Sequence, residues 1–209
     1  MFVLTIDQQG SRRVGDHVEE LLRFFAGHPA AAASARGVVR AFERTVGDEV
    51  QAVLDDAEVA VSIALTVLRL GGWSVGIGAG PIDVPLPESS RAGSGDAFVF
   101  ARAAVDQAKS RMRPIPLSVA GAGSESAADA EAVLTLVAAV AARRTPAGWE
   151  VIDALLAAGE GARQETVAAR IGVSQQAVSQ RLRTALWAEE LAARPLAARL
   201  LASAESVPA

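Results

Sequence analysis

The sequence has no cysteine and only two histidines, His17 and His28, among its 209 residues. The lack of cysteine excludes a disulfide framework and any metal site built on thiolates. Two histidines are too few for a histidine-rich zinc site. Lysine occurs once, as Lys109, so arginine supplies nearly all of the positive charge.

The sequence also lacks a hydrophobic run long enough for a membrane-spanning helix. Its longest apolar stretch, at residues 132–142, falls short of the roughly 20 residues that such a helix needs. The first ten residues have no basic segment and already contain Asp7, which is unlike a signal peptide. We therefore expect a cytoplasmic protein that has no membrane partner.

Charge and hydrophobicity narrow the class of protein further. Hydrophobic residues make up 51% of the sequence, which favours folded cores over global disorder. The net charge of −4 argues against a protein that is basic throughout, although it allows a local patch for nucleic acid. The length allows one large domain or two small ones.

The first part of the chain predicts alternating strands and helices, in an order that begins with the βαββαβ arrangement of a ferredoxin-like fold. A small, polar stretch at residues 121–130 is typical of a linker, and every later segment predicts helix. We therefore predict the α+β class, with a ferredoxin-like domain at residues 1–124 and an all-α domain at residues 125–209. The predicted strands are 2–6, 37–46, 49–55, 73–81 and 115–121, and the predicted helices between them are 15–27, 56–70 and 97–109.

Residues 163–186 have the pattern of a helix-turn-helix. Gly172 suits the left-handed turn between the helices, Val173 fills the angle that they make, and Ser174 caps the second helix. The alternative is a helical hairpin that makes only protein contacts. The apolar residues that we expect to face inward are Val167, Ala168, Ile171, Val178, Leu182 and Ala185.

The outward face of the second helix carries side chains that suit DNA. At about 100° per residue, one stripe lies opposite Val178 and Leu182, and glutamine and arginine on it can bind adenine and guanine. Between residues 159 and 187, four arginines against Glu160 and Glu165 give a local charge of +2. This sign is right for phosphate contacts. The predicted DNA-binding residues are Ser174, Gln175, Gln176, Ser179, Gln180, Arg181 and Arg183.

The N-terminal domain resembles the class III nucleotide cyclase homology domain. The resemblance rests on an acid that ends the first strand (Asp7), on RTVGDEVQAV, on SVGIGAGPI and on SGDAFVFARAAVDQAK. In that family, two aspartates at the positions of Asp7 and Asp48 bind the catalytic metal ions, so the resemblance implies a possible Mg²⁺ site. Arg44 replaces the family's base-selecting lysine, and Val99 replaces its transition-state asparagine. We therefore predict no catalytic residue and no required cofactor.

The same positions leave two interpretations of the N-terminal domain open. Asp7, Arg44 and Asp48 are the predicted ligand site for a nucleotide or another anion. Alternatively, Asp48 and Glu49 only shape a turn, and the domain serves as a dimerising scaffold. The segment 11–13, Ser-Arg-Arg, follows closely and is interpreted either as a phosphate ligand or as a pair of solvated arginines.

Over nearly its full length, the chain resembles the SatD-type bacterial proteins, which are described as DNA-binding regulators. The matching segments are FVLTIDQQGSRR, FERTVGDEVQAVL, WSVGIGAGPI, GWEVIDALL and VSQQAVSQRLR. We predict a sequence-specific regulator that binds double-stranded DNA as a homodimer, because one reading helix covers only a short half-site. Two alternatives remain: a nucleotide- or metal-binding protein with residual enzyme activity, and a protein–protein adaptor.

Overall fold

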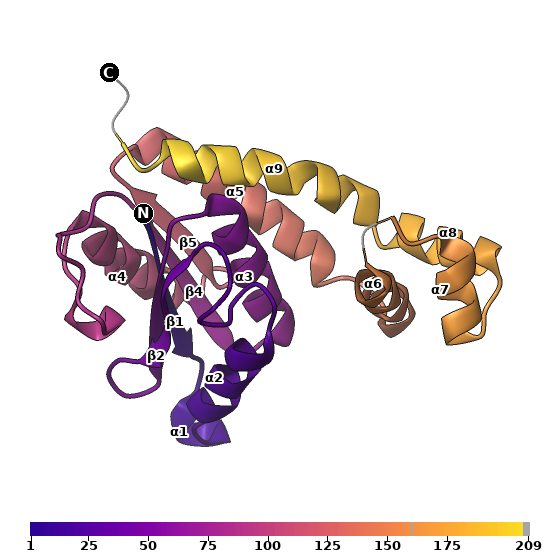
Figure 1. Cartoon of the computed structure of the whole chain (residues 1–209), viewed down its shortest axis with the longest axis horizontal. Coiled ribbons are helices and arrows are strands. Elements are labelled where there is room, and N and C mark those ends of the chain that lie inside the picture. The colour runs from indigo at the N-terminus through magenta and orange to yellow at the C-terminus, as the bar shows by residue number, and fades with distance from the viewer. Residues whose placement is uncertain (160, 207–209) are drawn as a thin grey trace. The chain divides into compact units, whose positions relative to one another are not determined.

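The structure is a computed structural model that describes residues 1–159 and 161–206. Within these ranges it contains one five-stranded sheet, nine α-helices and one short 3-10 helix (Figure 1), so the predicted α+β class is confirmed. The chain divides into two compact units. Unit 1 comprises Met1–Thr135 and Arg194–Ala209, and unit 2 comprises Leu136–Ala193. Each helix within the described ranges is too short or too polar to cross a lipid bilayer.

The sheet of unit 1 has the strand order β2-β3-β1-β4-β5. Its central strand, β1 (Phe2–Gln8), pairs antiparallel with β3 (Glu49–Leu54) on one side and with β4 (Trp73–Ala79) on the other. The edge strand β2 (Val38–Arg44) forms a hairpin with β3, and β5 (Leu117–Gly121) runs parallel to β4. All five predicted strands are confirmed, with ends that differ by a few residues.

Helices cover both faces of this sheet, with α4 (Asp96–Ala108) on one side and α2 (Val18–Gly27) and α3 (Ala57–Leu70) on the other (Figure 1). Glycine in β4 explains the close approach of α4. A Cβ atom on Gly78 would lie 2.1 Å from the carbonyl oxygen of Ala97, and one on Gly76 would lie 2.3 Å from the backbone nitrogen of Val105. The Gly-rich strand therefore makes room for a helix.

The predicted linker at residues 121–130 is wrong, because the structure has the helix α5 (Ser124–Ala141) there. Ala127 and Ala130 of this helix are buried. Because alanine is small, these positions lack the large apolar residues by which a core is usually recognised in a sequence. At the end of β5, Gly121 lies against the C-terminal segment, and a Cβ atom on it would come within 2.6 Å of the Ala204 carbonyl oxygen. Residues 194–206 therefore belong to unit 1, which differs from the predicted division after residue 124.

Helices make up the rest of the chain. Thr145 caps α6 (Pro146–Ala158) by accepting a hydrogen bond from the Gly148 amide at 3.2 Å, as its Thr-Pro start predicts. The helix α9 (Trp187–Ser203) continues through Pro195. The remaining helices are α1 (Ser11–Val14), η1 (Ser90–Ala92), α7 (Gln164–Ile171) and α8 (Gln175–Thr184).

Candidate functional site

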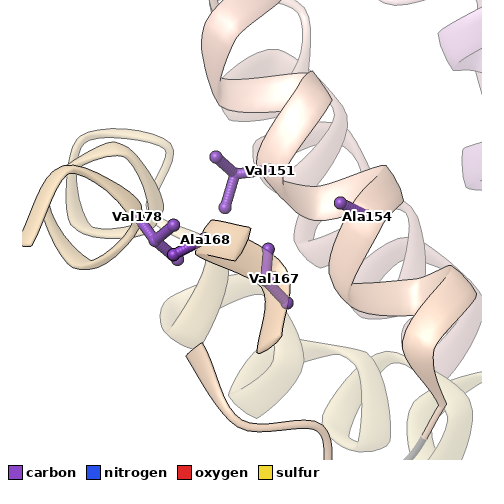
Figure 2. Packing of buried hydrophobic residues seen from close by; sticks show 5 residues of the cluster. All are labelled: Val151, Ala154, Val167, Ala168 and Val178. Atoms are coloured by element: carbon purple, nitrogen blue, oxygen red, sulfur yellow. The ribbon is translucent and has the colours of Figure 1, made fainter. Parts of the chain in front are cut away.

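The helices α6, α7 and α8 of unit 2 close around one small hydrophobic core (Figure 2). The predicted inward residues are confirmed: those of α7 and α8 are buried in this core or packed against it, and Ala185 is buried in a second cluster with Ile152 and Trp187. The contribution of α6 was not predicted, since it depends on contacts between separate helices. The buried members are Val151, Ala154, Val167, Ala168 and Val178, and Leu155, Ile171, Val173 and Leu182 pack around them.

The turn between α7 and α8 has the predicted chemistry. Gly172 adopts a left-handed conformation, with φ 70° and ψ 34°, in which a side chain would be strained. The Val173 amide then donates to the Ala168 carbonyl oxygen at 3.0 Å, which satisfies a free carbonyl group at the end of α7. The Ser174 hydroxyl accepts a hydrogen bond from the Ala177 amide at 3.2 Å and so caps α8. These contacts determine the direction in which α8 leaves the turn.

The predicted reading stripe lies on the outer surface of α8. Gln175, Gln176, Gln180 and Arg183 are exposed, and Ser179 is half-buried. Their side chains have no hydrogen bond or ion pair with any residue that the structure describes. This surface is therefore polar, anchored from behind by a hydrophobic core, and free to contact a partner.

Arg181 lies on a different face of α8. Its guanidinium donates to the Glu150 carboxylate of α6 at 2.8 Å. At 100° per residue, Arg181 stands about 60° from the buried Val178, whereas Gln180 stands about 160° from it. Of the predicted DNA-binding residues, Arg181 thus braces α8 against α6, and Ser174 uses its hydroxyl as the helix cap. Glu160, which entered the local charge count, lies outside the residues that the structure describes.

Arg144, which was not among the predicted site residues, supports the C-terminal end of α8. The Arg144 side chain is only 1% exposed and forms an ion pair with Glu190 of α9, with 2.6 Å between nitrogen and oxygen. Its Nε donates to the Ala185 carbonyl oxygen at the C-terminal end of α8, at 2.7 Å. The guanidinium carbon lies 4.8 Å from the ring centre of Trp149 and 5.6 Å from that of Trp187. Trp187 is therefore a core residue.

In unit 1, the predicted acid Asp7 lies at the end of β1 and faces α4. Its carboxylate is 2.9 Å from the Lys109 ammonium. Burial raises the pKa of Asp7 above its ordinary value, nearby Asp48 and Glu49 raise it further, and Lys109 opposes the rise. Lys109 thus supplies the positive charge that a metal ion would otherwise bring to this carboxylate.

The neighbour of Asp7 across the sheet is Glu49, because the register of β1 and β3 pairs these two residues. Glu49 is buried, and its carboxylate accepts hydrogen bonds from Arg102 of α4 at 2.6 and 3.1 Å and from the Thr45 hydroxyl at 2.6 Å. Asp48 is half-buried in the hairpin turn, where its carbonyl oxygen accepts from the Gln8 amide at 3.1 Å. The register between β1 and β3, which depends on long-range contacts, therefore places Glu49 beside Asp7.

These acids suit Mg²⁺ poorly as they stand. Asp7 and Glu49 already have cationic partners on α4, and a divalent cation needs several free oxygen ligands. Across residues 1–159 and 161–206, no group of three or more histidine, cysteine, aspartate or glutamate side chains is arranged to hold a metal ion. A site at Asp7 and Asp48 would therefore require Lys109 to move away from Asp7.

Arg44 is not brought together with Asp7. It pairs across the hairpin with Val50, one residue beyond Glu49, and so faces the opposite side of the sheet. There its guanidinium donates to the Asp16 carboxylate at 2.6 Å. The predicted three-residue ligand site is thus split between two faces. Val99, which stands where the cyclase family has asparagine, is 66% exposed on α4.

Comparison with known proteins does not assign either region. No protein-family model, curated protein sequence or solved structure matches this chain. The resemblances to the cyclase domain and to the SatD-type proteins therefore stay predictions.

Proposed function

We propose that this chain is a sequence-specific, DNA-binding transcriptional regulator. In this proposal α7 and α8 form a helix-turn-helix, and α8 is the helix that enters the major groove. One observation carries the proposal: α8 presents a stripe of unpaired glutamine and arginine side chains from a rigidly braced position.

The chemistry of the stripe suits bases. Glutamine can bind adenine through two hydrogen bonds, and arginine can do the same with guanine. Gln175 and Gln176 begin α8, and residues at the start of a reading helix contact base edges. Arg170 lies on α7 and Arg163 lies just before it. Both are exposed and suit phosphate contacts.

The rest of the proposal concerns unit 1. The strand order and the antiparallel pairing of β1 with β3 and β4 support a ferredoxin-like arrangement, and the resemblance to SatD-type regulators is consistent with the same role. We assign this unit to pairing two copies of the chain and to sensing an anionic ligand. Two copies would place two reading helices on a two-fold symmetric DNA site.

The experiment is selection of binding sites from a random double-stranded DNA library by the whole chain. The expected result is one enriched, two-fold symmetric motif whose affinity falls as salt rises, because phosphate contacts release counterions. Gln180→Ala should relax the preference at one base pair of each half-site, and Arg36→Ala, on an exposed arginine of unit 1, is the matched control. A chain with no salt-dependent affinity for DNA would refute the proposal.

A catalytic role is not part of this proposal. The carboxylates at the end of β1 are paired with α4, and Val99 cannot donate a hydrogen bond to a developing charge. The check is incubation with nucleoside triphosphates and Mg²⁺ or Mn²⁺. A cyclic product that disappears in Asp48→Ala would show that the chain is an enzyme.

A further inference from the structure

A pocket of about 1050 Å³ opens in unit 1 where β1 ends. Its walls come from the segment after β1, from α2, from the turn between α3 and β4, and from the segment that follows α4. This volume is at the upper end of the ~300–1,000 Å³ that is typical of small-molecule sites. It is therefore large enough for a metabolite, and all of its walls belong to one unit.

Two glutamines tie the walls of this pocket together. The Gln8 side chain, which is only 4% exposed, donates to the Gly15 carbonyl oxygen at 2.6 Å and accepts from the His17 amide at 2.8 Å. The Gln9 side chain donates to the Trp73 carbonyl oxygen and to the Ser74 hydroxyl, both at 3.2 Å. These bonds hold two loops against the end of β1 before any ligand arrives, which lowers the entropic cost of binding.

Among the described residues, two cations on the lining have no ion-pair partner, and the lining acid Glu20 lies 3.0 Å from the His17 ring nitrogen. Lys109 is paired with Asp7, and Arg113 is paired with Glu131, at 2.6 Å. Arg13 and Arg111 also line the pocket, and neither has an ion pair or side-chain hydrogen bond within the residues that the structure describes. Both are exposed, so their guanidinium groups are available to a ligand at the mouth of the pocket. A guanidinium binds carboxylate or phosphate through two parallel hydrogen bonds.

The remaining wall of the pocket is apolar. Phe24 and the buried Leu21 and Trp73 line it, and Leu70 and Val14 are about half exposed there, at 48% and 50%. Half-exposed apolar side chains inside a tied, polar-rimmed pocket suit the hydrocarbon or aromatic part of a ligand. The pocket thus combines two free cations with an apolar surface.

We propose that this pocket binds a small organic anion, whose carboxylate or phosphate pairs with Arg13 and Arg111 and whose apolar body lies against Leu70 and Trp73. The inference deepens the ligand-sensing part of the proposed function and rests on it, while DNA binding can hold without it. It also moves the ligand away from Arg44, which faces the other side of the sheet.

The test uses Trp73, which lines the pocket, as a reporter of binding to the whole chain without DNA. Benzoate and phenyl phosphate serve as the carboxylate and phosphate probes, and uncharged benzamide is the matched control. We expect at least one anion to change the fluorescence of Trp73 at millimolar concentration, and Trp73→Phe to remove this change. Arg13→Ala with Arg111→Ala should weaken that binding by about tenfold or more.

The control variant is Arg12→Ala, which removes an exposed neighbouring arginine that does not line the pocket. It should bind the probe as the wild-type chain does, and the arginine variants should keep the wild-type melting temperature because their replaced side chains are exposed. Absence of any response to both anions, equal binding of benzamide, or unchanged binding in the double arginine variant would overturn the inference. Because Arg183→Ala should bind the probe normally, failure here is distinguishable from failure of the DNA proposal.

Discussion

The outer face of α8 and the carboxylate cluster of Asp7 and Glu49 both gather polar side chains, but only the first leaves them unpaired. Gln180 and Arg183 have no partner within the described residues, whereas Asp7 and Glu49 are each held by a cation of the neighbouring helix. Polar residues that are already paired stabilise the fold, and unpaired ones on a braced surface are available to a ligand. A cluster of polar side chains therefore does not identify a binding site by itself, because side chains that already have partners in the protein are not available to a ligand.

The largest effect should come from removing the support below α8. Arg144→Ala leaves the buried Glu190 carboxylate without its partner, which costs about 3–5 kcal/mol in the free energy of unfolding. Chemical denaturation would measure this loss, and DNA binding should disappear with it. Arg143→Ala, on the exposed residue beside it, should change stability by less than about 0.5 kcal/mol. Equal stability of the two variants would show that Arg144 does not support α8.

The next effect separates the two arginines of α8. Arg183→Ala should weaken binding to the selected DNA site by about 1–3 kcal/mol and relax the preference at one base pair. Arg181→Ala breaks only a partly exposed ion pair with Glu150, so base preference should be unchanged. Fluorescence anisotropy on matched and mismatched duplexes measures both. If Arg181→Ala altered base preference as much as Arg183→Ala, the assignment of the two faces would be wrong.

At the end of β1, Arg102→Ala should have a smaller effect on stability. It removes two hydrogen bonds from the buried Glu49, but the Thr45 hydroxyl remains and the Arg102 side chain is half exposed. We expect a loss of about 1 kcal/mol in the free energy of unfolding, with DNA binding by α8 unchanged. Glu49→Gln with Arg102→Ala should recover part of the loss, which a thermal melt would show. A loss of DNA affinity would contradict the structural role.

The smallest effect is a pair of opposite pH dependences in unit 1. Burial raises the pKa of Asp7, so stability should fall as pH rises from its ordinary value near 3.8 through its raised value. Burial alone would also raise the pKa of Glu131, but hydrogen bonds from Ser118, Arg113 and the Val119 amide outweigh it and hold that pKa below its usual range. The stability from ionised Glu131 is therefore present above its ordinary pKa and is lost as pH falls through its lowered pKa.

The measurement compares the melting temperatures of Asp7→Asn and Glu131→Gln with the wild-type chain from acid to neutral pH. Relative to the wild-type chain, Asp7→Asn should become more stable as pH rises, and Glu131→Gln less stable. If the melting-temperature differences of both variants changed in the same direction with pH, Asp7 would be stabilised as an ion by Lys109, and its contrast with Glu131 would not hold.

Local rules predicted the helix pair better than the sheet site. Val167, Ala168, Gly172 and Val178 lie within twelve residues, and helix periodicity, the glycine turn and the cap need no distant partner. At the end of β1, the contacts of Asp7 depend on Lys109, about a hundred residues away, which no local pattern reveals. The sequence therefore predicted which residues of the helix pair face inward, and it predicted Asp7 without its partner.

Two other differences have physical causes of the same kind. The resemblance to the cyclase domain places Arg44 in one ligand site with Asp7, but the register of β2 and β3 turns it toward Asp16. The predicted linker was wrong because small residues carry a weak hydrophobic signal even when they are buried, as Ala127 and Ala130 are in α5.

The division of the chain has a consequence for its synthesis. Unit 1 needs residues on both sides of unit 2 in the sequence, because Ala197, Leu201 and Ala204 are buried and Gly121 lies directly against Ala204. During translation, residues 194–206 are made only after all of unit 2. Unit 1 can therefore complete its core only when unit 2 has already been synthesised, although the last strand of its sheet ends at Gly121.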